Sequence, residues 1–137
     1  MPSPAIRPFW KNYIAGRWDD GARCRRISLE NPATAAPLAE IARAEVQDVD
    51  RAVQAARKAF DTGVLRSLKP AARMDLLFRI AAELEALTEE IALAECLDNG
   101  KRISEARAQA AESARYFRYY GGIADKLEGR TIPLGEG

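Results

Sequence analysis

The candidate nucleophiles in this sequence are two cysteines, and the sequence contains no histidine. Cys24 has arginines on both sides, and their positive charges favour the thiolate, which is the reactive form of cysteine. Without histidine there can be no Ser-His triad, no Cys-His pair and no histidine-bound zinc. We therefore expect Cys24 to be an exposed loop residue, Cys96 to be a small buried residue, and neither to be a catalytic nucleophile.

Acidic pairs and glycines are the next residues that could carry chemistry. The pairs Glu83 with Glu85 and Glu89 with Glu90 lie on the polar faces of predicted helices, where solvation and helix ion pairs are expected. Neither G-x-G-x-x-G nor G-x-x-x-x-G-K-[ST] occurs, so no phosphate-binding loop is predicted. Gly121 and Gly122 predict a close packing contact or an interruption of a helix.

An aromatic cluster near residue 118 could in principle stack on nucleic-acid bases. It consists of Tyr116, Phe117, Tyr119 and Tyr120, together with Arg115 and Arg118. The formal net charge is only +1, from 21 Lys and Arg against 20 Asp and Glu. That balance argues against a nucleic-acid or acidic membrane partner, because both bind through excess positive charge. Core packing of the aromatic rings, with the two arginines in salt bridges, is the expected arrangement.

Length and composition favour one globular domain in a reducing compartment. The chain has 137 residues, of which 47% are hydrophobic and 30% are charged. Prolines at positions 2, 4 and 8 argue against a signal peptide, and residues 1–8 are expected to form an extended arm. Two distant cysteines make a poor disulfide framework, so a cytoplasmic location is expected. No run of residues approaches the ~18–20 apolar residues that a membrane span needs, so no span is expected.

The first part of the chain predicts short strands. Residues 13–18 are apolar and aromatic with a glycine in a turn position, and residues 19–21 form a turn signal. Residues 26–30 alternate polar and apolar side chains, and residues 38–41 form one more short strand. These segments together predict a small antiparallel β element.

The period then changes to that of about four α-helices. The first begins at Val46 with one apolar face, and the second begins near Pro70, which suits a first helical turn. Thr88 is expected to cap a third helix ending at residues 98–100, and Ser104 a fourth reaching about Asp125. The inner face of the fourth helix is expected to carry Ala106, Ala110, Ala114, Phe117 and Tyr120 or Gly121.

Five blocks in the right order resemble the N-terminal quarter of the NAD(P)-dependent aldehyde dehydrogenase superfamily. They are Tyr-Ile-Ala-Gly-Arg-Trp at residues 13–18, Asn-Pro-Ala-Thr at 31–34, the helix at 48–60, Leu-Asp-Asn-Gly-Lys at 97–101, and residues 118–126 with 129–133. The resemblance is greatest to the betaine- and other small-aldehyde branches. One departure is Glu45, which stands where the family has a hydroxyl residue before the first helix.

The resemblance implies an α/β parent fold that oxidises a small aldehyde to a carboxylic acid with NAD or NADP. Residues 9–130 would belong to the cofactor-binding domain, and residues 131–137 would begin the strand leading to the oligomerisation hairpin of a homo-oligomer. The family's catalytic cysteine, glutamate and asparagine lie in later motifs, as do its cofactor-binding groups. No catalytic or cofactor-binding residue is therefore assigned, and the partner of this segment would be the remainder of the parent polypeptide.

The resemblance also implies one ion site and leaves one rival function. In the family, the aspartate of the Leu-Asp-Asn-Gly-Lys block and nearby carbonyl oxygens can hold K+ or Na+. The matching positions are Asp98, Leu29 and Glu30, although Asp98 could instead only stabilise its turn. The rival function is a truncated, non-catalytic helical fragment that acts as a subunit-interaction module.

Overall fold

The computed structural model describes residues 6–129 and 131 of the chain. Its elements in order are β1 (Phe9–Trp10), β2 (Asn12–Ile14), β3 (Arg17–Asp19), β4 (Arg26–Glu30), β5 (Pro37–Ala42), α1 (Val46–Asp61), α2 (Pro70–Ala86), α3 (Thr88–Asn99) and α4 (Ile103–Ile123). This order confirms the prediction of short strands followed by four helices. The arm and the hairpin strand predicted for residues 1–8 and 131–137 lie largely outside the described residues.

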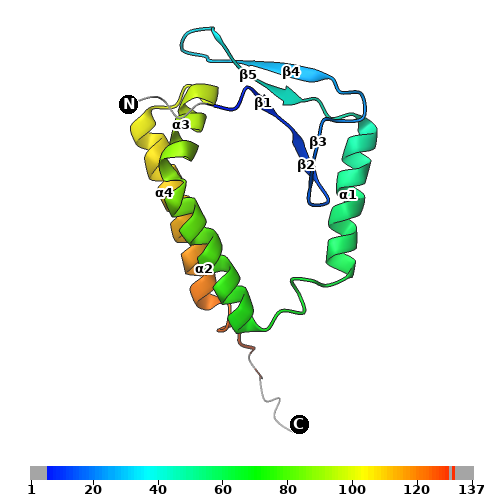
Figure 1. Cartoon of the computed structure of the whole chain (residues 1–137). Coiled ribbons are helices and arrows are strands. Elements are labelled where there is room, and N and C mark those ends of the chain that lie inside the picture. Colours follow the sequence, from blue (N-terminus) through cyan, green and yellow to red (C-terminus); the bar gives the residue numbers. More distant parts are fainter. Residues whose placement is uncertain (1–5, 130, 132–137) are drawn as a thin grey trace, which may run out of the picture.

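The strands form two small sheets at one end of the structure (Figure 1). In the larger sheet, of order β1-β5-β4, strand β4 pairs antiparallel with β5, as predicted. The pairing of β1 with β5 is parallel, which differs from the purely antiparallel element expected from sequence. A strand of two residues has no alternating pattern from which its direction could be read.

Strands β2 and β3 form a tight hairpin that carries the first aromatic pair. Ala15 and Gly16 both have positive φ, 53° and 80°, as a two-residue hairpin turn requires. Tyr13 pairs with Trp18 across the strands, and their ring centroids lie 4.9 Å apart. Cross-strand aromatic pairs of this kind stabilise a hairpin that is otherwise only marginally stable.

The helices begin where predicted, but two of the predicted caps are wrong. The N-cap residues of α3 and α4 are Leu87 and Arg102, and neither side chain makes a capping hydrogen bond. A single residue separates α2 from α3, so the Thr88 hydroxyl donates back to the Leu84 carbonyl of α2 at 3.2 Å. Ser104 lies inside the first turn of α4, because that helix begins one residue earlier.

Helices α2, α3 and α4 pack together through small side chains, while α1 stands apart beside the β2–β3 hairpin (Figure 1). The buried apolar side chains of the described residues are all alanines: Ala42, Ala81, Ala92, Ala106, Ala110 and Ala114. Three of them lie on the predicted inner face of α4. Among residues 6–129 and 131, no helix has the length and apolar character of a bilayer-spanning segment.

The tyrosines of α4 correct one expectation about this helix. Tyr116, Tyr119 and Tyr120 are exposed rather than packed in the core, because the close contacts of α4 are made by its alanines and Gly121. The predicted salt bridges are confirmed: Arg115 pairs with Glu112 at 2.9 Å, and Arg118 pairs with Glu85 of α2. Glu85 of α2 and Glu89 of α3 thus link their helices to α4, since Glu89 pairs with Arg107 at 2.9 Å.

Two adjacent glycines of α4 provide a matched test of this packing. A Cβ on Gly121 would lie 2.8 Å from Phe78, whereas a Cβ on Gly122 would have no neighbour within 4 Å. We expect Gly121→Ala to destabilise the chain by about 1–3 kcal/mol through overpacking. Gly122→Ala should instead stabilise it by about 0.5 kcal/mol, because alanine favours helix. Urea unfolding measures both changes, and shifts of the same sign and size would contradict the packing described here.

Candidate functional site

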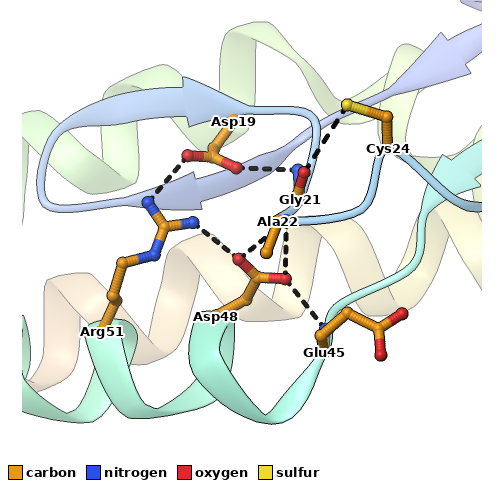
Figure 2. Close-up of polar contacts among 7 residues, drawn as sticks. All are labelled: Asp19, Gly21, Ala22, Cys24, Glu45, Asp48 and Arg51. Atoms are coloured by element: carbon orange, nitrogen blue, oxygen red, sulfur yellow. Dashed lines mark hydrogen bonds and ion pairs between the residues drawn. The ribbon is translucent and has the colours of Figure 1, made fainter.

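The densest polar cluster joins the β2–β3 hairpin to the start of α1 (Figure 2). At its centre is the carboxylate of Asp48, which is completely buried and is the largest fully buried side chain among the described residues. It accepts hydrogen bonds from the backbone N–H of Ala22 at 3.0 Å and of Glu45 at 2.9 Å. Arg51 Nη2 donates to the other carboxylate oxygen at 2.6 Å.

Arg51 connects the buried carboxylate to the hairpin. Its Nη1 donates to Asp19 Oδ2 at 3.0 Å, and Asp19 Oδ1 accepts from the Gly21 N–H at 2.7 Å (Figure 2). Gly21 has a φ of 82°, and a Cβ there would lie 2.9 Å from the Arg43 carbonyl oxygen. Glycine at this position therefore lets the chain turn tightly enough to present the Ala22 N–H to Asp48.

Hydrogen bonding sets the charge state of this cluster. Donation from the Glu45 and Ala22 backbones and from Arg51 lowers the pKa of Asp48 from its ordinary 3.8 to about 2. The same arginine lowers the pKa of Asp19, and its own pKa is raised by the two carboxylates. An ionised carboxylate with this pKa is too weak a base for proton transfer near neutral pH. The cluster therefore holds the hairpin against the helix, and Asp48 is not suited to act as a general base.

Sequence reasoning missed this cluster. Glu45 was noted only as a departure from the hydroxyl residue that the family has before the first helix. The available signal was an acidic residue at the third helical position, which can accept from the N–H of the N-cap residue. Here Asp48 at that position accepts from the Glu45 N–H at 2.9 Å, and the Glu45 side chain accepts from Arg25 Nε at 2.7 Å.

The two cysteines lie as expected and do not meet. Cys24 is exposed and Cys96 is half-buried, and both are free thiols. Cys24 has a φ of 48°, and its thiol donates to the Gly21 carbonyl at 3.7 Å. A carbonyl accepts a hydrogen bond but does not remove the proton, so this contact does not activate the thiol.

Two of the three predicted ion-site residues line one hollow between the larger sheet and α3. The hollow has a volume of about 490 Å³ and is lined by Leu29 and Asp98, among others, but not by Glu30. The turn after α3 lies close to the turn that follows β4, since a Cβ on Gly100 would lie 3.1 Å from Pro32. Within the described ranges, no three His, Cys, Asp or Glu side chains gather as metal ligands. A cation here would need carbonyl oxygens beside Asp98.

The turn itself is closed by Asn99 and Gly100. Gly100 takes the left-handed conformation, with a φ of 75°, and Asn99 Oδ1 accepts from the Lys101 N–H at 3.0 Å. Lys101 then reaches Glu95 and Gln109, which ties the turn to α3 and α4. The Asp98 carboxylate is exposed and contributes none of these hydrogen bonds.

Comparison with known proteins defines the class of this chain as the N-terminal part of a larger α/β protein. The chain belongs to the aldehyde dehydrogenase family, whose family model matches residues 18–137. It is 41% identical over 120 residues to an aldehyde dehydrogenase from Aspergillus niger, an alignment that covers 88% of this chain and 24% of the relative. The five sequence blocks had predicted this membership, and the prediction is confirmed.

Solved structures agree with the sequence comparison. The NAD-dependent aldehyde dehydrogenase from Sinorhizobium meliloti superposes with a TM-score of 0.85 at 33% identity, covering 94% of this chain and 26% of that one. A point mutant of betaine aldehyde dehydrogenase from Staphylococcus aureus in complex with NAD+ gives a TM-score of 0.84 at 29% identity, over 90% and 25%. The chain thus spans about a quarter of the length of the relatives it matches.

Proposed function

We propose that this chain is the N-terminal portion of an NAD(P)-dependent aldehyde dehydrogenase that oxidises a small aldehyde to a carboxylic acid. The observation that carries the proposal is the agreement of two comparisons. The family model matches residues 18–137, and the structure of the chain superposes on part of a longer aldehyde dehydrogenase with the same arrangement of elements. In this role residues 9–130 belong to the cofactor-binding domain, and residues 131–137 lead toward an oligomerisation hairpin. The free cysteines are consistent with a cytoplasmic location, and the parent enzyme is proposed to be a homo-oligomer.

In the proposed enzyme, the described residues hold the scaffold in place and take no part in the oxidation of the aldehyde. NAD or NADP would supply hydride acceptance when bound, and a cysteine thiolate elsewhere in the parent polypeptide would attack the aldehyde carbon. The cluster of Asp19, Asp48 and Arg51 fixes the hairpin on α1, and the small residues of α4 fix the helix layer. The contribution of this chain is therefore rigidity of the scaffold.

The chain alone is expected to be catalytically silent, and an activity assay tests this. Purified chain is mixed with NAD or NADP and with acetaldehyde, propionaldehyde or betaine aldehyde, and reduced cofactor is followed by absorbance. We expect no aldehyde-dependent reduction, because the thiol of Cys24 meets only a carbonyl and Cys96 is half-buried at the end of α3. Turnover that Cys24→Ser or Cys96→Ser abolished would overturn the proposal.

We also propose that Asp98, with backbone oxygens of Leu29 and Glu30, holds K+ or Na+ in the parent enzyme. Support comes from the hollow that Leu29 and Asp98 line together, although Glu30 lies outside its lining. Ion binding to the folded state adds about 1–3 kcal/mol at ~5–100 times Kd. In the parent, Asp98→Ala should lower Tm and remove its dependence on K+ or Na+, while Asp98→Asn should do less. An equal response of wild type and Asp98→Ala to K+, Na+ and choline would contradict the ion site.

The rival function, a non-catalytic interaction module, has support in the exposed apolar side chains. Tyr116, Tyr119 and Tyr120 of α4 and the valines of α1 are open to solvent in this chain. Both functions place a partner on these surfaces. They differ in the partner, which is the remainder of an aldehyde dehydrogenase in the first case and an unrelated protein or a further subunit in the second.

A further inference from the structure

Helix α1 has two faces, and the chain packs against only one of them. Asp48, Arg51 and Ala55 face the β2–β3 hairpin, where the polar cluster and a hollow of about 790 Å³ lie between helix and hairpin. At 3.6 residues per turn, Val53 projects about 140° away from Asp48 around the helix axis. The hairpin therefore cannot cover the side of the helix on which Val53 lies.

The uncovered side carries the apolar stripe of the helix. Val46, Val49, Val53 and Phe60 project within an arc of about 60° of one another. Their exposed fractions are 77%, 53%, 61% and 63%. Ala52 and Ala56 widen the arc to about 120°, which is wide enough for a helix face that packs on a protein core. Beyond the helix, Val64 and Leu65 are exposed as well.

The stripe carries no charge of its own, and Arg57 at its edge already has an acidic partner. Arg57 binds Asp61 one turn away at 2.8 Å, and its guanidinium lies 5.3 Å from the centre of the Phe60 ring. A partner therefore needs no charged group to satisfy this surface. Neutral aliphatic side chains fit it best, as in the interior of a domain.

We propose that this stripe, defined by Val46, Val49, Val53 and Phe60, is covered by the later part of the same aldehyde dehydrogenase polypeptide. The inference rests on the proposed function and names the surface through which this portion joins the rest. Relatives about four times as long superpose on the chain with TM-scores of 0.84 and 0.85, so complete enzymes keep the same arrangement of these elements. The width and neutrality of the stripe match a core face, whereas a contact between subunits carries a polar rim.

A trans-assembly experiment tests this occupant. The 137-residue chain is produced together with the complementary polypeptide, meaning the part of the Aspergillus niger enzyme C-terminal to the matched region. Wild type should form a one-to-one complex with it. Val53→Asp should weaken that complex at least about tenfold, because a carboxylate would have to enter an apolar contact. Gln54→Asp adds the same charge at the neighbouring exposed position, outside the stripe, and should bind as wild type does.

A second variant and a folding control keep the result interpretable. Valine and aspartate have similar helix propensities, so far-ultraviolet circular dichroism should show equal helix content for both aspartate variants. Val49→Lys introduces the opposite charge on the stripe and should lose binding as Val53→Asp does. Equal binding by Val53→Asp and Gln54→Asp would overturn the inference, and so would a wild-type chain that does not bind the complement.

Three further outcomes separate this inference from the proposed function. A chain that forms a stable dimer by itself, which Val53→Asp dissociates, would mean that a second copy covers the stripe and would overturn the inference. An active complex that Val53→Asp leaves unchanged would do the same while the proposed function stands. A complex that needs Val53 but oxidises no aldehyde would support the inference while the proposed function fails.

Discussion

Replacing Asp48 with alanine is expected to lower the Tm of the chain by on the order of 10 °C, the largest effect of a single substitution within the described structure. The reason is the number of groups that one buried carboxylate serves. Its removal leaves the Ala22 and Glu45 N–H groups without their acceptor, and Arg51 without its buried partner. Buried donors left without partners cost more than the hydrogen bonds themselves contribute. Thermal unfolding followed by circular dichroism measures the loss.

The charge of Asp48 gives this prediction an independent control in pH. Because folding lowers its pKa from 3.8 to about 2, its stabilising contribution is fully present above pH 3.8 and is lost as the pH falls toward 2. Asp48→Asn keeps the shape of the side chain and one acceptor, so it should lose less stability than Asp48→Ala. It should also lack this part of the acid destabilisation. Identical acid profiles for wild type and Asp48→Asn would contradict the ionised state.

The second large effect is expected at Gly21, where backbone conformation and a close contact act together. Gly21 has a φ of 82°, and a Cβ there would lie 2.9 Å from the Arg43 carbonyl oxygen and 3.5 Å from Asp48 Oδ2. Backbone atoms cannot move aside as a flexible side chain can. Gly21→Ala therefore combines left-handed strain of ~1–2 kcal/mol with an overpacking cost of ~1–3 kcal/mol.

Gly16 is the matched control for Gly21. Its φ is 80°, but the nearest atom to its Cβ would be the Tyr13 hydroxyl oxygen at 3.9 Å. Gly16→Ala should therefore show the left-handed strain alone, and the difference between the two variants measures the contact with Arg43. Urea unfolding of both proteins checks this, and equal losses would mean that Gly21 lies less close to the Arg43 carbonyl than described.

The features predicted from sequence are those that local physics determines. The stripe of α1 repeats with the period of a helix over its whole length, Pro70 suits only the first turn of a helix, and Gly100 suits the left-handed residue that ends one. Each signal lies within a few residues of the feature it specifies. The family membership was predictable for another reason, since several such local blocks occur in one order.

The features that were not predicted depend on contacts between distant segments. Asp48 gains its buried position from Ala22, and no local pattern indicates that the hairpin folds onto α1. The parallel pairing of β1 with β5 likewise joins Trp10 to Ile41. The exposed tyrosines of α4 were misplaced because aromatic composition favours a core, whereas α4 buries alanines and leaves Tyr116, Tyr119 and Tyr120 exposed.

The candidate ion site lies between these two cases. The resemblance placed Asp98 near β4, and in the structure Asp98 and Leu29 line one hollow. The same reasoning did not foresee that Asn99 rather than Asp98 closes the turn through the Lys101 N–H. Because Asp98 is not needed for its own turn, its carboxylate is available for another ligand. The response of wild type and Asp98→Ala to K+ and Na+ tests whether that ligand is a cation.

Restoration of activity in trans is the measurement that tests the central claim most directly. The 137-residue chain and the complementary polypeptide of the Aspergillus niger enzyme are assayed separately and together for aldehyde-dependent reduction of NAD. We predict no activity for either polypeptide alone and activity for the mixture. The mixture should remain active when the 137-residue chain carries both Cys24→Ser and Cys96→Ser. An assembled mixture that remained inactive, or one whose activity required Cys24 or Cys96, would contradict the claim that this chain is a non-catalytic portion of an aldehyde dehydrogenase.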